Sequence, residues 1–187
     1  MKKLISILML CAATQTFAME VAGIKLDDKL QLDSHQLVLS GAGIRTKFYI
    51  KVYAAGLYMA DKKRTSAAVL ADSGANRMLF RMMRDVSGKK MLDAISEAFP
   101  PNNSAEEMKA MEARLAEFSK MFSTVNEVKE GQEITFDYLP GTGTRVTVGG
   151  VSKGRIEGAD FNRALLKMWV GDKPVQADLK QNLLGGN

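Results

Sequence analysis

The chain has 187 residues, of which 26 are Lys or Arg and 21 are Asp or Glu, so its formal net charge at pH 7 is +5. Because no basic cluster is interleaved with aromatic residues, this charge argues against nucleic acid as a partner. The single histidine and the single cysteine nearly exclude a zinc site, a Cys-His pair or a Ser-His-Asp triad. We therefore expect no metal and no cofactor.

The N-terminus has the pattern of a bacterial secretory signal peptide. Lys2 and Lys3 precede an apolar run, Leu4 to Ala13, which is too short to span a bilayer. Thr16-Phe17-Ala18 follows and ends in the small residue that a signal peptidase requires. We predict a signal peptide over residues 1–18, cleaved after its last residue.

Removal of this leader changes the composition and length of the chain that folds. Cys11 leaves with it, so no disulfide can form. Residues 19–187 are long enough to bury about 70 % of their surface as a single domain. They contain no second apolar run of membrane-spanning length. We therefore predict a periplasmic protein without stable membrane insertion, and the oligomeric state stays open.

The residues after the leader predict short strands and then a longer one. Turn residues near Asp27-Asp28 and Asp33-Ser34 divide the segment from Val21 to Leu39. From Thr46 the sequence alternates with a period of two, which predicts one strand with a face in the core. Gly56 would mark a bulge or bend in it. The two sides of this strand would carry Phe48, Ile50, Val52 and Ala54 on one, and Lys47, Tyr49, Lys51 and Tyr53 on the other.

The central part predicts a strand followed by helices. Arg77 to Arg84 alternates again, and Ser87 is an N-cap candidate for a helix that Pro100-Pro101 ends. Ser104 and Glu107 have the spacing of a capping box. They introduce a predicted helix whose apolar residues recur at three- and four-residue steps: Met108, Met111, Leu115, Phe118 and Phe122.

The C-terminal part predicts a three-stranded meander and two helices. Its strands would run over residues 134–138, 145–148 and 151–156. A helix with Phe161 and Trp169 inward would end at Gly171, and Pro174 would open a last helix at its first position. Strands early and late, with helices between and after them, indicate the α+β class, with an antiparallel sheet covered on one face by helices.

Arg45 is the main candidate for a functional side chain. Gly41 and Gly43 precede it and would permit a tight bend of the backbone. A guanidinium is permanently charged and offers a planar fork of donors, which suits a carboxylate or phenolate at the mouth of an apolar cavity. Tyr53 and Tyr58 would add hydroxyl donors and an apolar wall. From the alternation alone, an ordinary strand with a solvent-facing side is the competing interpretation.

Six distinctive segments follow one another between about residue 21 and residue 185. They are Leu39-Ser-Gly-Ala-Gly-Ile-Arg45, Lys51-Val-Tyr-Ala-Ala-Gly-Leu-Tyr58, Arg84-Asp-Val-Ser-Gly88, Phe161 to Gly171, Lys173-Pro-Val and Leu179 to Gly185. In order and spacing they resemble the chalcone isomerase-like family, and its bacterial secreted branch in particular. The resemblance implies an open-faced β-sandwich, in which a large antiparallel sheet lies under a layer of helices with a ligand cleft between them.

The resemblance also implies roles for individual residues. The family includes plant enzymes that close a chalcone ring and relatives that bind fatty acids without catalysis. The arginine that holds the enzymes' phenolate matches Arg45, and their catalytic threonine falls at Tyr53. The fatty-acid-binding relatives pair an arginine with a tyrosine, which this chain resembles more. The other polar site residues of the enzymes correspond to Met91, Ala98, and Lys167 or Met168 of this chain. The resemblance therefore implies that this chain lacks the enzymes' hydroxyl network.

Arg45 and Tyr53 are eight positions apart, roughly 26 Å along a straight strand, so they can share a ligand only if the chain folds back or the sheet curls. We predict Arg45, Tyr53 and Tyr58 as ligand-binding residues and assign no catalytic residue. The first hypothesis is a non-catalytic periplasmic binder of a small apolar acid. The alternatives are an isomerase of the intramolecular lyase type acting on a phenolic enone, and a protein-interaction module with a vestigial cleft.

Overall fold

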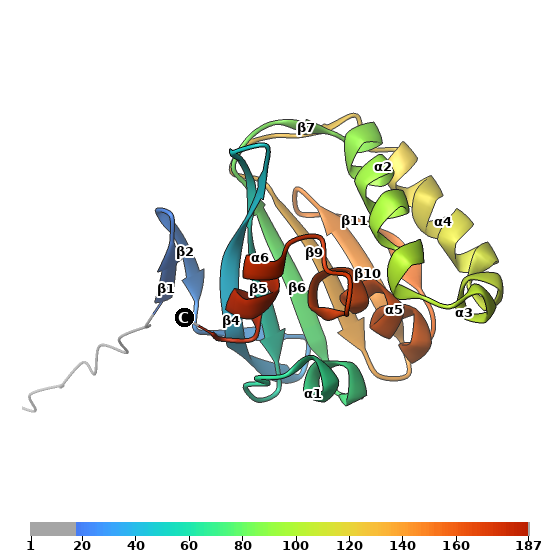
Figure 1. Ribbon diagram of the computed structural model, residues 1–187, viewed down its shortest axis with the longest axis horizontal. Helices are drawn as coiled ribbons and strands as arrows, with labels where there is room; N and C mark the ends of the chain where they lie inside the picture. Colours follow the sequence, from blue (N-terminus) through green and yellow to red (C-terminus); the bar gives the residue numbers. More distant parts are fainter. Residues whose placement is uncertain (1–17, 187) are drawn as a thin grey trace, which may run out of the picture.

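The computed structural model describes residues 18–186, and most of its strands form one antiparallel sheet (Figure 1). The seven strands of this sheet lie in the order β11-β10-β9-β6-β5-β4-β3. Two further pairs, β1 with β2 and β7 with β8, form separate ribbons. The strands are β1 (Ala18–Val21), β2 (Ile24–Asp27), β3 (Lys29–Leu32), β4 (His35–Lys47), β5 (Ile50–Met59), β6 (Asn76–Met82), β7 (Val86–Ser87), β8 (Glu127–Val128), β9 (Glu133–Leu139), β10 (Gly143–Val148) and β11 (Val151–Ile156).

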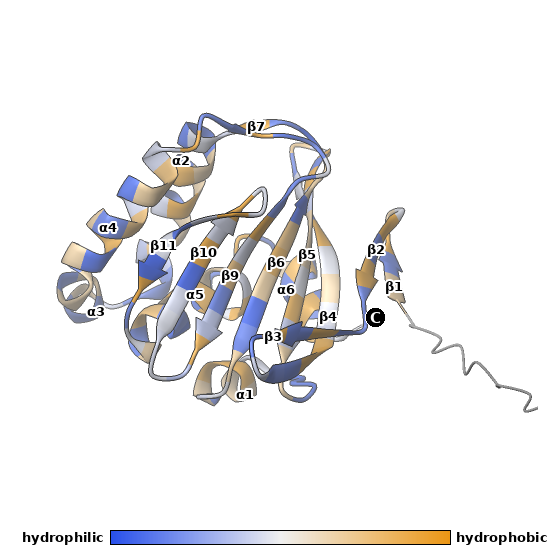
Figure 2. Ribbon diagram, turned by 180° about the vertical axis from the view of Figure 1, so that it is seen from behind, coloured by the Kyte–Doolittle hydropathy of each residue, from blue (hydrophilic) through white to orange (hydrophobic). Residues whose placement is uncertain are grey.

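Helices cover one face of the sheet and leave the other visible from behind (Figures 1 and 2). The α+β class and the open-faced sandwich predicted from the sequence are therefore confirmed. The predicted signal peptide lies outside the described residues except for Ala18, which begins β1. Within residues 18–186 no helix is long and apolar enough to cross a membrane. The helices are α1 (Ser66–Ala71), α2 (Gly88–Ala98), the 3-10 turn η1 (Pro100–Asn102), α3 (Ala105–Ala110), α4 (Glu112–Ser123), α5 (Ala159–Val170) and α6 (Ala177–Leu183).

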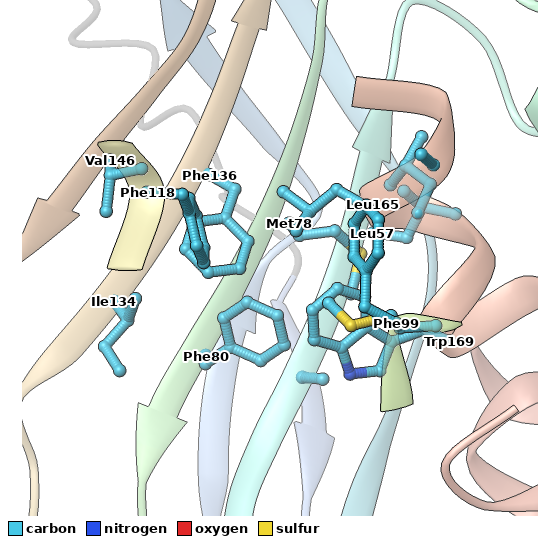
Figure 3. Packing of buried hydrophobic residues seen from close by; sticks show 14 of the residues in the cluster. Leu57, Met78, Phe80, Phe99, Phe118, Ile134, Phe136, Val146, Leu165 and Trp169 are labelled. Carbon is cyan, nitrogen blue, oxygen red and sulfur yellow. The ribbon is translucent and has the colours of Figure 1, made fainter. Parts of the chain in front are cut away.

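The core lies between the sheet and the helices and is rich in aromatic side chains (Figure 3). Phe80 of β6 is central to it. Its ring lies 5.4 Å from that of Phe136 and 4.9 Å from that of Trp169 in α5. Such aromatic contacts add about 0.5–1.5 kcal/mol each beyond the area that they bury. The alternation predicted for β6 is confirmed, because Met78, Phe80 and Met82 all face this core.

The single strand predicted from Thr46 onward is wrong, because the chain reverses there. β4 ends at Lys47, β5 begins at Ile50, and these two residues pair across the hairpin. The turn consists of Phe48 and Tyr49, whose φ angles are 49° and 64°. This left-handed conformation costs an ordinary residue roughly 1–2 kcal/mol. The sequence pattern concealed the turn, since aromatic residues occupy positions where Asn or Gly is usual.

The predicted bulge at Gly56 is also wrong. Gly56 pairs regularly with Ala42 and with Leu79 on its two neighbouring strands. The β4–β5 register is irregular at two other places: Ser40 is an extra residue in β4, and Val52 is an extra residue in β5, opposite the step from Arg45 to Thr46. A Cβ atom on Gly56 would lie 3.2 Å from Leu39 Cδ1, so close packing accounts for the glycine.

Two helical predictions need smaller corrections, while the Ser87 N-cap and the capping box are confirmed. The helix after Ser104 is interrupted at Met111, which has ψ near 1° and separates α3 from α4. The last helix begins at Ala177 and not at Pro174, because Gln176 has an extended backbone and serves as the N-cap residue.

Candidate functional site

A cavity of about 800 Å³ opens between the sheet and the helix layer. Its inner wall is formed by core side chains of the sheet and of α5, including Phe80, Phe136 and Trp169. On the helix side, α2 contributes Met91 and Ile95. Pockets of about 300–1,000 Å³ with mostly apolar walls and a few polar groups are typical of small-molecule sites. The cavity is therefore large enough to hold an organic ligand.

Arg45 lines this cavity, and helix α6 packs closely against the preceding residues of β4. A Cβ atom on Gly41 would lie 2.1 Å from the carbonyl oxygen of Asn182, and one on Gly43 would lie 3.0 Å from Leu179 Cδ1. The two glycines are therefore needed for close approach, and not for the tight bend predicted from the sequence, since neither has a positive φ. Their close contact brings the beginning of α6 beside Arg45.

Gln176, the residue before α6, fixes the position of Arg45. Its side-chain oxygen accepts hydrogen bonds from the backbone N–H of Thr46 at 2.8 Å and from Arg45 Nη1 at 3.2 Å. Its amide nitrogen donates to the carbonyl of Ile44 at 3.2 Å. Gln176 thus contacts three consecutive residues, 44–46, near the end of β4 and holds the guanidinium from one side.

The remaining donors of Arg45 are available to a ligand. Nη1 also donates to the carbonyl of Thr46 at 2.8 Å. Within residues 18–186, the Nε and Nη2 groups form no hydrogen bond and no carboxylate pairs with the guanidinium. Arg45 is partly buried, whereas the other charged residues that line the cavity are exposed. A partly buried guanidinium with unused donors is suited to bind an anion.

Tyr53 lies in the same cavity and is held by Trp169. The indole Nε1–H donates to the Tyr53 hydroxyl oxygen at 3.0 Å, and the Tyr53 ring packs edge-on against Phe80. Burial raises the pKa of Tyr53, an effect that the Trp169 hydrogen bond and the charge of Arg45 partly offset. The phenol therefore keeps its proton at neutral pH, and its O–H group can donate a hydrogen bond to a ligand oxygen.

The hairpin brings Arg45 and Tyr53 together. They are direct partners in the register of β4 and β5, and directly opposed residues of antiparallel strands have Cα atoms only about 4.5–5.5 Å apart. The separation of roughly 26 Å expected for a straight strand does not exist, because the chain folds back at Phe48 and Tyr49. Two of the three predicted ligand-binding residues thus meet at one site.

The structure places Tyr58 elsewhere. It lies five positions after Tyr53 on β5, so it points to the opposite face of the sheet. There it is 1 % exposed and packs in a second apolar cluster with Leu39 and Leu79. Burial, with a further contribution from the charge of Asp27, raises its pKa well above the usual range. Tyr58 does not line the cavity, and the alternation along β5 could have revealed this from the sequence.

The positions matched to the polar residues of plant chalcone isomerases also lie at the cavity, but they are apolar. Met91, Ala98 and Met168 all line it. Lys167, the other candidate for the last of these positions, points away and pairs with Glu107 at 2.8 Å. The polar groups of the inner cavity are therefore concentrated at Arg45 and Tyr53.

Two residues of the site were missed in the sequence. Gln176 follows the Lys173-Pro-Val segment and has no periodic signal of its own, so its link to Arg45 could not be read from the pattern. Trp169 was expected only as a core residue, although a buried indole N–H usually requires an acceptor. That requirement could have prompted a search for a hydroxyl partner such as Tyr53.

No curated protein shows significant similarity to the sequence. Among solved structures, the fatty-acid binding protein AtFAP1 of Arabidopsis thaliana superposes with a TM-score of 0.65 at 15 % identity, over 87 % of this chain and 92 % of that one. This likeness concerns the fold. The family model described as chalcone isomerase-like matches residues 18–185. Because that match spans nearly the whole sequence, the chain belongs to the chalcone isomerase-like family.

Proposed function

We propose that this protein is a non-catalytic, periplasmic binder of an apolar carboxylic acid of the fatty-acid type. The observation that carries the proposal is the pairing of Arg45 and Tyr53 at an apolar cavity of about 800 Å³. The guanidinium would hold the carboxylate through its free Nε and Nη2 donors, and the Tyr53 hydroxyl would add a third hydrogen bond. The apolar walls would bury the tail.

The charges around the cavity support an anionic ligand. Its exposed rim carries the cations Lys47, Arg84, Lys90 and Lys173. Three acidic residues also line the rim: Asp85 is paired with Lys129 and Asp93 with Lys89, while Glu97 forms no ion pair within residues 18–186, so the cations still outnumber the acids. Excess positive charge at a cleft raises the local concentration of anions and speeds their association. The name of AtFAP1, which describes a fatty-acid binding protein of similar fold, is consistent with this ligand class.

The isomerase alternative has less support from the site. General acid–base help is typically worth about 10²–10⁴-fold in rate, and Met91 and Ala98 cannot supply it. Arg45 would have to hold the phenolate of an enone with Tyr53 as the one nearby proton donor. We therefore expect negligible chalcone cyclisation by the pure protein. Turnover above buffer that disappears in Arg45→Ala would instead support the enzyme.

The binder proposal is tested by titration of saturated acids of increasing chain length into wild-type and variant protein. Truncating one partner of a desolvated charge pair costs about 2–5 kcal/mol, so Arg45→Ala should bind at least tenfold more weakly. Arg45→Lys should recover only part of the affinity, because an ammonium lacks the planar fork. Trp169 is the only tryptophan and lines the cavity, so its fluorescence offers a readout beside calorimetry.

Arg114→Ala is the matched control, because Arg114 pairs with Asp160 at the surface and does not line the cavity. It should leave acid binding unchanged. Equal affinity in wild type and Arg45→Ala would remove Arg45 from the site. Absence of acid binding by the wild type would favour the protein-interaction module. The periplasmic part is tested separately, since N-terminal sequencing of exported protein should begin at Met19.

A further inference from the structure

The tip of the β4–β5 hairpin exposes a compact group of large apolar side chains. Phe48 is 84 % exposed, Tyr49 is 101 % exposed and Ile50 is 49 % exposed. These residues are consecutive and lie at the turn that joins the two long strands β4 and β5 (Figure 1). Isolated exposed apolar residues are common, but a contiguous group marks a contact surface.

The turn itself does not explain these side chains. A two-residue hairpin turn in which both residues have positive φ strongly favours Asn-Gly. Here the positions are Phe48 and Tyr49, with φ angles of 49° and 64°. The β10–β11 hairpin has residues that are usual for such a turn, since Gly149 and Gly150 occupy its two positions of positive φ. The strained aromatic pair is therefore retained at a place where smaller residues would fold more easily.

Cations flank the aromatic pair. Lys47 and Lys51 lie on either side of the turn, both are exposed, and within residues 18–186 neither forms an ion pair. The backbone N–H of Met83 donates to the carbonyl of Val52 at 3.0 Å, which brings the segment leading to Arg84 against the base of the hairpin. Exposed apolar residues thus project from a rim with unpaired positive charge.

We propose that this hairpin tip docks on the surface of a bilayer that contains anionic phospholipids. Phe48 and Tyr49 would enter the interfacial region, where aromatic side chains are favoured, and Lys47 and Lys51 would contact the head groups. The docking is peripheral, since only the tip enters and no element crosses the bilayer. A protein partner fits less well, because a few side chains at a hairpin end cover far less than the roughly 1,200 Å² of a stable protein interface.

The docking site adjoins the cavity. Lys47, Phe48 and Ile50 belong to its lining as well as to the tip, so the cavity mouth would face the bilayer in the docked state. If the proposed acid binding is correct, this arrangement would let an acid pass between membrane and cavity without crossing water. The docking itself does not depend on that function.

The test is co-sedimentation with vesicles of phosphatidylcholine alone and of phosphatidylcholine mixed with phosphatidylglycerol. Wild-type protein should bind the mixed vesicles, with an affinity that falls as salt is added. Phe48→Asn/Tyr49→Gly should lose at least tenfold in affinity, because it removes the two most exposed apolar side chains of the tip. This pair is the preferred sequence for the turn, so the variant should fold at least as stably as wild type. Lys51→Gln should lose about fivefold, from roughly 1 kcal/mol per cation near an anionic surface.

Val151→Ser is the control, since Val151 is 59 % exposed at the tip of the other hairpin, and it should bind as wild type does. Wild type and variants are all prepared as the mature chain that begins at Met19, so the predicted apolar leader cannot bind the vesicles in place of the tip. Tyr49→Gly separates the two functions, because Tyr49 does not line the cavity: it should weaken vesicle binding and leave acid binding in solution unchanged. Absence of wild-type binding to the mixed vesicles, or equal binding by the tip variants, would overturn the proposal.

Discussion

The two faces of the sheet use arginine in opposite ways. On the face without helices, Arg77 of β6 pairs with Asp137 of β9, and Arg145 of β10 joins the same carboxylate at 3.3 Å. Figure 2 shows this face, with hydrophilic segments along β6 and β10. On the helix-covered face, Arg45 is held by the neutral Gln176 and has no acidic partner within the described residues.

This difference separates a structural arginine from a candidate binding arginine. Asp137 is 1 % exposed, and a buried carboxylate requires a cation. Arg77 therefore has its charge neutralised within the fold. The charge of Arg45 is left for a ligand, although the side chain is partly buried. A change on the first face should alter stability, and a change on the second should alter binding.

The largest expected effect is on stability. Asp137→Ala would leave the partly buried Arg77 without a carboxylate, while Arg145 would keep its second partner, Asp33. Breaking a buried pair in this way typically costs about 3–5 kcal/mol. Denaturant titration followed by circular dichroism measures the loss. Asp160→Ala, which breaks the exposed pair with Arg114, should cost at most about 1 kcal/mol. Equal losses in the two variants would contradict the structural role assigned to the buried pair.

An intermediate effect is expected on affinity, and two tyrosines of β5 provide the comparison. Tyr53→Phe removes a hydroxyl that would donate to the bound carboxylate, so acid binding should weaken by about 1.5 kcal/mol, or tenfold. Tyr58→Phe removes a hydroxyl on the opposite face of the sheet and should leave affinity unchanged. The same calorimetric titration measures both. Weaker binding in Tyr58→Phe alone would reverse the assignment of the two faces.

The smallest effect is confined to alkaline solution. The folded chain raises the pKa of Tyr53 and of Tyr58 above the unfolded value of 10.0, in both cases mainly through burial. Above pH 10 the unfolded chain loses these protons while the folded chain keeps them, so the free energy of unfolding should fall as pH rises. Below pH 10 this contribution is fully present. Denaturation midpoints measured from pH 9 to 11 should fall less steeply in Tyr53→Phe/Tyr58→Phe than in wild type, and identical slopes would exclude the effect.

Much of this fold could be predicted from local signals. The Ser104–Glu107 capping box, the glycine turns of the C-terminal meander and the alternation of β6 depend on residues close together in the sequence. The β4–β5 hairpin could not be predicted in this way. The alternation of apolar and polar residues continues through Phe48 and Tyr49, and neither residue is a usual turn former. The predicted strand therefore ran straight through a reversal of the chain.

The sequence by itself determined the α+β class, the order of most elements and the family, and it singled out Arg45 as a candidate for ligand binding. These follow from periodicity, turn residues and motif spacing, which are local properties of the chain. Only the tertiary structure decided which residues share the cavity. The Arg45–Gln176 and Tyr53–Trp169 hydrogen bonds join residues 131 and 116 positions apart, and Tyr53 meets Arg45 only through the register of a hairpin. Such contacts depend on how packed elements align in space, and this alignment leaves no periodic trace in the sequence.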